Sequence, residues 1–126
     1  MSGTPLQHFQ SEGSEASYSA AVRVGDLIWT CGQLGAEPGG PAVDFETQAE
    51  AALKRLVAVV EEAGGSVRTI VKINGYLASM SDFAAYDRIY RSVIAPQPMP
   101  ARSTVQIGGF VEPLLVEVDA IAVAQQ

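Results

Sequence analysis

The sequence predicts an α+β fold: a single mixed sheet with two helices packed on one face. Two segments place apolar residues at helical spacing, and five short runs rich in β-branched residues are bounded by Gly and Pro, as strands usually are. The predicted order is ββαβαββ. The opposite face then lacks helical cover, and its apolar strands suit burial against other subunits. We expect strands over 18–24, 27–31, 69–77, 102–107 and 114–124.

The first two strands form a predicted hairpin, because only Gly25 and Asp26 separate two apolar runs. A loop rich in Gly and Pro follows over 36–42. Before the hairpin, residues 1–16 are polar, and we expect them to form a flexible arm that holds His8, the one histidine.

The first helix follows the loop, and Asp44 is its predicted N-cap. Gly64 and Gly65 end it, since glycine readily adopts the left-handed conformation that follows many helices. Its buried face consists of apolar residues at helical spacing: Phe45, Ala49, Ala52, Leu53, Leu56, Val60 and Ala63.

A second helix is predicted from about Asp82 to Ile94, with Ser81 as its cap. Three prolines then stop the helix and stiffen the approach to Arg102. In the last strand, alternation places Glu117 and Asp119 on one face, and Val116 and Val118 on the other.

Composition limits the function classes. The chain has 126 residues, the length of one domain, and a net charge of −6, and its eight basic residues are scattered. This argues against nucleic-acid and anionic-membrane partners. One cysteine, Cys31, excludes an intrachain disulfide, and one histidine leaves no zinc ligand set, so no metal is expected. The N-terminus lacks an apolar signal-peptide core, so a soluble cytoplasmic protein is expected.

Two charged residues stand out because they lie inside strand-like runs, where a charge is costly without a partner or a task. Arg102 opens one run and Glu117 lies within the next. Glu117 is either part of a solvated strand face or a proton carrier in a partly dry site. Arg102 is either a surface residue or a guanidinium that binds a ligand carboxylate.

Four segments of the sequence belong together: Cys31-Gly32-Gln33, Asp82-Phe83-Ala84, Pro100-Ala101-Arg102-Ser103-Thr104-Val105 and Val116-Glu117-Val118-Asp119-Ala120-Ile121-Ala122. With these segments the chain resembles the RidA (YjgF-type) reactive imine/enamine deaminase family. The resemblance runs from about Tyr18 to Val123, in the order and spacing of that family.

The resemblance implies a chorismate-mutase-like fold in a homotrimer, with the sheets facing inward and clefts between subunits. It implies hydrolysis of 2-imino acids and enamines to 2-oxo acids and ammonia, without a cofactor or metal. Arg102 matches the arginine that binds the substrate carboxylate, and Glu117 matches the glutamate that activates water. The remaining matches to cleft residues are Tyr18 at the mouth, Cys31 and Gly32 at the wall, and Thr104 beside the reacting carbon.

The sequence departs from the family at the mouth of the site. Cys31 replaces a serine, Gly35 replaces a proline, and Asp119 replaces a second glutamate, while Glu15-Ala16-Ser17 precedes Tyr18 in place of Gly-Pro. These changes bear on substrate preference. The alternative function is a non-catalytic trimer that binds small carboxylates or a protein partner. Ribonuclease activity, sometimes attributed to this family, is disfavoured because no basic patch is evident.

Overall fold

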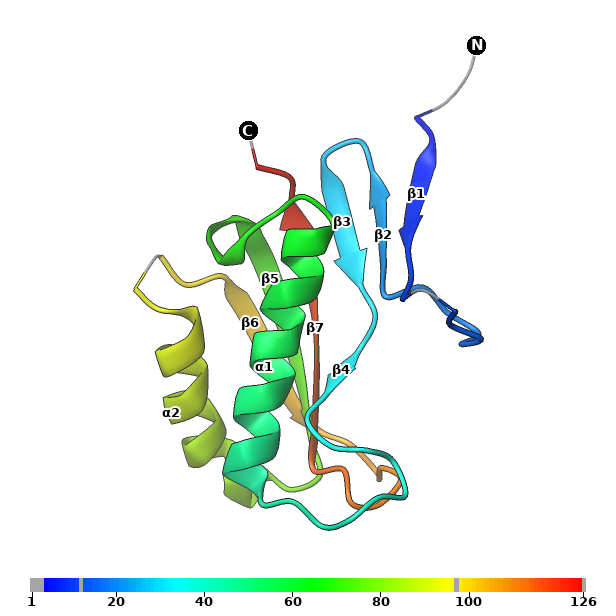
Figure 1. The fold of residues 1–126 in the computed structure, drawn as a ribbon. Coiled ribbons are helices and arrows are strands. Elements are labelled where there is room, and N and C mark those ends of the chain that lie inside the picture. The colour runs from blue at the N-terminus through cyan, green and yellow to red at the C-terminus, as the bar shows by residue number, and fades with distance from the viewer. Residues whose placement is uncertain (1–3, 12, 97, 126) are drawn as a thin grey trace.

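A computed structural model describes residues 4–11, 13–96 and 98–125, and it has the predicted α+β architecture (Figure 1). The strands lie in the order β1-β2-β3-β7-β5-β6, and β4 pairs with β7. The sheet is mixed, since β5 and β6 are parallel while the other pairs are antiparallel. The elements are β1 (Leu6–Phe9), β2 (Ala21–Val24), β3 (Leu27–Thr30), β4 (Gln33–Leu34), α1 (Phe45–Glu62), β5 (Ile70–Leu77), α2 (Phe83–Ile94), β6 (Ala101–Gln106) and β7 (Val116–Val123).

The first helix begins and ends as predicted. The Asp44 side chain accepts a hydrogen bond from the Thr47 backbone N–H at 2.7 Å, which satisfies one free donor of the first turn. Gly64 follows the helix with φ of 104°, a conformation that other residues rarely adopt.

The cap predicted for the second helix is wrong. Ser81 lies inside a short 3-10 helix (Met80–Asp82), and Ser79 caps that turn by accepting from the Ser81 backbone N–H. The α-helix itself begins at Phe83, and its Asp82 cap makes no side-chain hydrogen bond. The capping serine is therefore Ser79, two residues before the predicted one, and it caps the tight turn that leads into the helix.

The N-terminal region also differs from the prediction. Within the expected arm over 1–16, Leu6–Phe9 forms β1, which pairs antiparallel with β2. Its side chains are largely exposed, so it lacks the apolar alternation that identifies a strand. The strand β1 forms instead through backbone hydrogen bonds at the edge of the sheet. The Ala20 N–H, which donates to the Phe9 carbonyl at 2.8 Å, continues these bonds beyond the strand.

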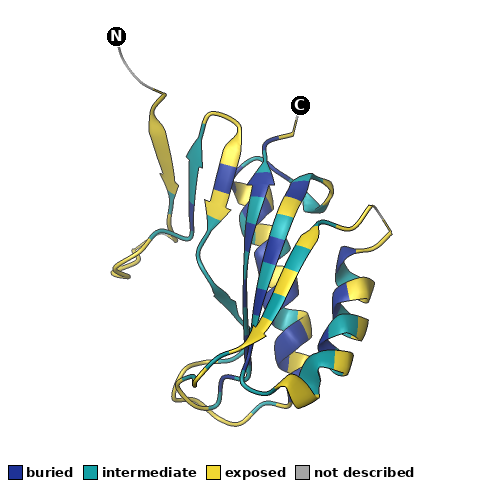
Figure 2. Cartoon of the chain, turned by 180° about the vertical axis from the view of Figure 1, so that it is seen from behind, coloured by how far each residue is buried: buried dark blue, intermediate teal, exposed yellow. Residues whose placement is uncertain are grey.

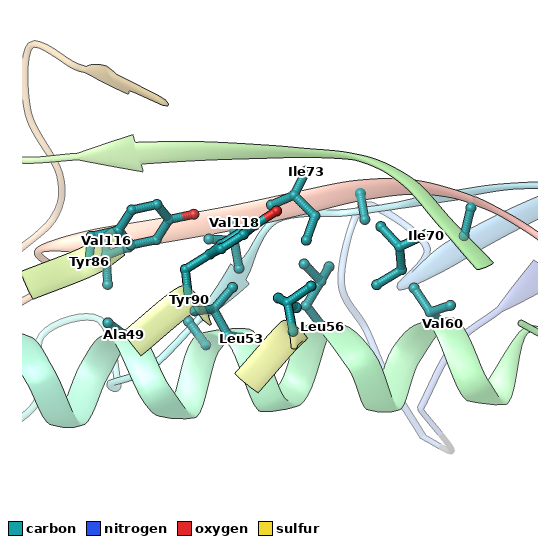
Figure 3. Close-up of a cluster of buried hydrophobic side chains, with 14 of the residues drawn as sticks. Ala49, Leu53, Leu56, Val60, Ile70, Ile73, Tyr86, Tyr90, Val116 and Val118 are labelled. Atoms are coloured by element: carbon teal, nitrogen blue, oxygen red, sulfur yellow. The ribbon is translucent and has the colours of Figure 1, made fainter. Parts of the chain in front are cut away.

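The core lies between the helices and one face of the sheet. Ile73 on β5 and Val116 and Val118 on β7 are fully buried there, and Leu53 and Leu56 of α1 pack against them (Figure 3). Burying such a side chain contributes about 1.5–3 kcal/mol relative to leaving it in water. The burial of Val116 and Val118 confirms the predicted alternation of β7. Glu117 and Asp119 therefore lie on the other face of the sheet, which we call the open face.

The open face carries no helix, and Figure 2 shows its exposed and half-buried strands. Leu27 and Trp29 on β3 alternate with buried Ile28, and Val105 on β6 lies opposite Tyr76. The side chains of Leu27, Trp29 and Val105 are each more than two-fifths exposed. The part of the chain that the structure describes contains no helix long and apolar enough to cross a membrane.

Candidate functional site

Glu117 lies on the open face, directly over the backbone of Gly32. The sheet breaks here: β3 ends at Thr30, and β4 resumes pairing with β7 through Leu34, which lies opposite Glu117. A Cβ atom added to Gly32 would overlap the Glu117 carboxylate. Glycine is therefore needed at position 32 because the carboxylate approaches the backbone so closely.

Burial raises the pKa of Glu117 above its ordinary value, and the charge of Asp119 raises it further. A carboxyl group with a raised pKa can hold and release a proton closer to neutral pH, which suits general acid–base chemistry. Of the two interpretations of Glu117, the partly desolvated carboxyl is the one that its surroundings favour.

Cys31 adjoins this carboxylate. Burial is the main cause that raises the pKa of its thiol, and the charges of Glu117 and Asp119 add to it. Its Sγ atom accepts a hydrogen bond from Gln33 Nε2 at 3.3 Å. The thiol therefore stays protonated at neutral pH and acts as a wall of the site, without the thiolate that a nucleophile requires.

A hollow of about 310 Å³ opens beside these residues, and Tyr18, Cys31 and Gly32 line it together. Two residues that the sequence did not single out also line it. Gln10 comes from the loop after β1, and Arg55 reaches in from α1, where it donates to the Leu34 carbonyl at 2.5 Å. Neither carried a sequence signal, because an arm residue and an exposed helix residue meet here only after folding.

Arg102 lies elsewhere, on the face of β6 that packs against α2. It pairs with buried Ile73 in the parallel register, so its side chain points toward the helices. The guanidinium carbon lies 4.8 Å from the ring centroid of Tyr90, 5.4 Å from that of Phe83 and 5.9 Å from that of Tyr86. Contacts of this kind attract a cation to the aromatic face and restrain it there.

Arg102 also has a carboxylate partner in its own chain. Its Nη1 donates to Asp87 Oδ1 at 2.8 Å, and Arg91 Nε donates to Asp87 Oδ2 at 3.0 Å. Hydrogen bonds from Arg102 and then Arg91 hold the pKa of Asp87 below its ordinary value. Sequence reasoning missed Asp87, since only its helical spacing to Arg91 is visible in the sequence.

A second cavity, of about 180 Å³, opens next to the guanidinium. It is large enough for a small carboxylic acid, and its lining residues are Asp87, Tyr90, Arg91, Met99, Pro100 and Arg102.

Thr104 lies on the same face as Arg102, two residues along β6. It pairs with Gly75, and its hydroxyl oxygen is buried without a hydrogen-bond partner among the described residues. A Cβ atom at Gly75 would press on the Tyr86 hydroxyl, so these groups pack tightly.

The predicted site residues thus form two groups within one chain. Tyr18, Cys31 and Gly32 line the hollow beside the break between β3 and β4, and Glu117, which is not among the residues that line it, lies over Gly32. Arg102 and Thr104 gather beneath α2, on the other face of the sheet and beyond the intervening strand β5. One copy of the chain does not bring the two groups together.

Within the described ranges, no group of three His, Cys, Asp or Glu side chains is placed to hold a metal ion.

The family model described as endoribonuclease L-PSP matches residues 9–124. A Salmonella typhimurium protein named 2-iminobutanoate/2-iminopropanoate deaminase is 33% identical over 110 residues, which cover 84% of this chain and 86% of that protein.

Two solved structures are closely similar. RidA from an Antarctic Psychrobacter superposes with a TM-score of 0.82 at 33% identity, covering 93% of this chain and 98% of the other. Escherichia coli TdcF with bound serine superposes with a TM-score of 0.84 at 28% identity, covering 94% of this chain and 99% of the other. Since the family model spans nearly the whole chain and the fold agrees, this chain belongs to the RidA (YjgF-type) family, whose model carries the description endoribonuclease L-PSP.

Proposed function

We propose that the protein hydrolyses reactive 2-imino acids, and their enamine tautomers, to 2-oxo acids and ammonia. The observation that carries this proposal is the partly desolvated Glu117 carboxyl, set over Gly32 beside the hollow that Tyr18 and Cys31 line. The deaminase named among the relatives supports the same reaction class. The small-molecule partner is then a 2-imino acid, and its product a 2-oxo acid.

The site is completed by a second copy of the chain. Arg102 and Glu117 belong to different groups in one chain, yet the proposed reaction needs both at one substrate. The open face exposes Leu27, Trp29 and Val105, which suit burial against another subunit. We therefore propose the homotrimer that the family resemblance implies, in which Arg102 of one subunit faces Glu117 of its neighbour.

Arg102 binds the substrate carboxylate in this scheme. Among the described residues only Asp87 accepts from its guanidinium, through Nη1, so Nε and Nη2 stay available as donors. A charge-assisted contact of this kind contributes about 2–3 kcal/mol to binding. The aromatic rings around the guanidinium restrain it before the substrate arrives, which reduces the entropy lost on binding.

Glu117 handles the proton in the hydrolysis. The carboxylate accepts a proton from water as the water oxygen bonds to the imine carbon, and the imine nitrogen becomes an amine by taking up one proton. The C–N bond of the resulting carbinolamine then breaks, and its electron pair goes to the nitrogen. Glu117 returns its proton to the leaving ammonia as the hydroxyl oxygen forms the carbonyl and releases its own proton to solvent, which replaces the solvent proton that the imine nitrogen took up. The steps balance as one imine and one water giving one 2-oxo acid and one ammonia.

An amino-acid oxidase that acts on 2-aminobutanoate supplies 2-iminobutanoate for the test, and semicarbazide competes for that imine. The wild type should lower the yield of the imine-derived semicarbazone, while Arg102→Ala and Glu117→Gln should not. Arg68→Ala, at an exposed arginine in the short 3-10 helix Val67–Thr69, which contributes no residue to either group, serves as the matched control and should behave as wild type.

A wild type that leaves semicarbazone formation unchanged contradicts the proposal. If the wild type hydrolyses no imine while both it and Glu117→Gln bind 2-oxobutanoate and Arg102→Ala does not, the non-catalytic carboxylate-binding alternative is correct. The cytoplasmic location remains a prediction that cell fractionation tests, and one relative, from Schizosaccharomyces pombe, is named as mitochondrial.

A further inference from the structure

Asp119 lies two residues after Glu117 on the same open face of β7, and its carboxylate is held by two neutral donors. Asn74, directly opposite on β5, donates from Nδ2 to Asp119 Oδ1 at 2.8 Å. Tyr76, which lies opposite Glu117 in the same register, donates its hydroxyl to Asp119 Oδ2 at 2.8 Å. Both oxygens are thus fixed, and neither donor carries a charge that would compensate the carboxylate.

From α1, Arg55 reaches the break and donates to the carbonyl of Leu34, which lies opposite Glu117, but burial and the charge of Asp119 are the two causes that raise the pKa of Glu117. From β5 Glu117 faces the Tyr76 phenol and, further along, Lys72, whose Nζ donates to Ser103 Oγ at 3.0 Å on the far strand β6. From the break before β4 it faces the Cys31 thiol, and from its own strand it faces Asp119. Arg102 of the same chain lies on the other face of the sheet, while in the proposed trimer the neighbour's Arg102 faces Glu117 and is the same in the wild type and in the Asp119 variants. Among the described residues, Asp119 is the charged group best placed to act on Glu117.

We propose that Asp119 is a positioning residue that acts through Glu117: Asn74 and Tyr76 lock its carboxylate on the open face, and its fixed negative charge sets the pH range over which Glu117 carries the proton. The inference rests on the proposed role of Glu117 and adds a residue to it. Two carboxylates on alternate residues of one strand lie about 7 Å apart, a distance at which like charges repel appreciably in a partly desolvated site.

The proposed reaction needs a Glu117 carboxyl with raised proton affinity. This carboxyl must return a proton to departing ammonia, and a carboxyl that loses its proton too readily does this poorly. The Tyr76 hydroxyl itself stays protonated, since burial and the hydrogen bond to Asp119 raise its pKa to about 12. It therefore remains a donor to Asp119 through the working pH range, and the arrangement does not change with pH there.

The decisive experiment is an NMR titration of the Glu117 side chain in the assembled protein, with glutamate isotope-labelled at the side-chain carboxyl carbon. Glu117→Gln identifies the resonance. In Asp119→Asn, the Glu117 midpoint should fall by about half a pH unit or more. Asp119→Glu restores the charge and should return the midpoint toward the wild-type value.

Asp26→Asn is the matched control, because it removes one negative charge from the exposed β2–β3 turn and should leave the midpoint unchanged. Asp119→Ser removes the same charge with a smaller side chain and replaces Asp119→Asn if that variant does not fold. An unchanged midpoint in the charge-removing variant, or an equal fall in Asp26→Asn, overturns the inference.

The titration does not require activity, so it separates this inference from the proposed function. If imine hydrolysis is present, the acidic limb of the kcat/KM profile should move with the NMR midpoint in each variant. If Asp119 has only a structural role, its variants should lower activity equally at every pH, and the limb should stay in place. If the wild type hydrolyses no imine, the proposed function fails, while the midpoint shift still decides the coupling between the two carboxylates.

Discussion

Arg102 and Asp87 form an ion pair, 2.8 Å between Nη1 and Oδ1, at the position where the arginine is proposed to receive a substrate carboxylate. Both side chains are about one-quarter exposed, so water partly screens the pair. The substrate therefore meets a guanidinium whose charge is partly compensated by its own chain. Asp87 sets how strongly Arg102 attracts an anion.

Asp87→Asn should strengthen the binding of 2-oxobutanoate. The asparagine oxygen still accepts the hydrogen bond from Arg102, so the guanidinium keeps its position while the competing negative charge is lost. A gain of about 0.5–1 kcal/mol corresponds to a Kd roughly two- to fivefold lower. Isothermal titration calorimetry measures it. Glu46→Gln, which removes an exposed acid that pairs with Arg88, is the control, and weaker binding by Asp87→Asn would contradict the account.

Gly32→Ala should abolish most of the hydrolytic activity without unfolding the chain. The added Cβ atom must displace the Glu117 carboxylate, and misplacing a catalytic group by about 1 Å costs roughly 100-fold in rate. The comparison is Gly108→Ala, where no atom lies within 4 Å of an added Cβ. Wild-type kcat/KM in Gly32→Ala would show that the Glu117 position is unimportant.

Removing the hydroxyl of Tyr86 and removing that of Tyr76 should change the free energy of unfolding in opposite directions. The Tyr86 hydroxyl is buried without a partner among the described residues, so Tyr86→Phe should raise the free energy of unfolding by about 1 kcal/mol. The Tyr76 hydroxyl donates to Asp119, so Tyr76→Phe should lower it by about the same amount. Urea unfolding at one protomer concentration measures both. Equal losses in the two variants would mean that Tyr86 has a partner.

The raised pKa of Glu117 predicts a specific dependence of stability on pH. Its folded pKa lies above the ordinary 4.5 of an unfolded chain, so the folded state binds more protons between the two values. The contribution of Glu117 to stability is therefore present at low pH and is lost as pH rises through this interval. Glu117→Gln should remove that fall, as unfolding at several pH values would show. An unchanged profile in Glu117→Gln would exclude a raised pKa.

Local sequence signals predicted the elements that depend on local chemistry. The capping group of Asp44, the turn at Gly64 and the alternation through Glu117 follow from neighbours a few residues away, and the structure confirms all three. The short strand Leu6–Phe9 was missed because hydrogen bonding at a sheet edge leaves no apolar pattern. The Ser81 cap was wrong because a 3-10 turn and an α-helix use the same residues to begin.

The sequence predicted which residues belong to the candidate site, but it predicted only part of their arrangement in space. Arg102 and Glu117 stood out because charges are unusual in apolar strands. Their placement on opposite faces depends on the parallel register that sets Arg102 beside Ile73, which no local pattern reveals. The pairing of Arg102 with Asp87 has the same origin, since it joins a strand to a helix only after α2 packs on the sheet.

Complementation between two inactive variants tests most directly the central claim that one site uses two copies of the chain. Arg102→Ala and Glu117→Gln, each with a different affinity tag, are expressed together, and the mixed assemblies are purified through both tags. In a trimer whose clefts each take Arg102 from one subunit and Glu117 from the next, every mixed trimer has one complete cleft, so about one-third of the clefts in the double-tagged assemblies are complete. We predict that mixed assemblies regain imine hydrolysis to about that extent, while each variant alone stays inactive. Mixed assemblies as inactive as the separate variants would contradict the shared site.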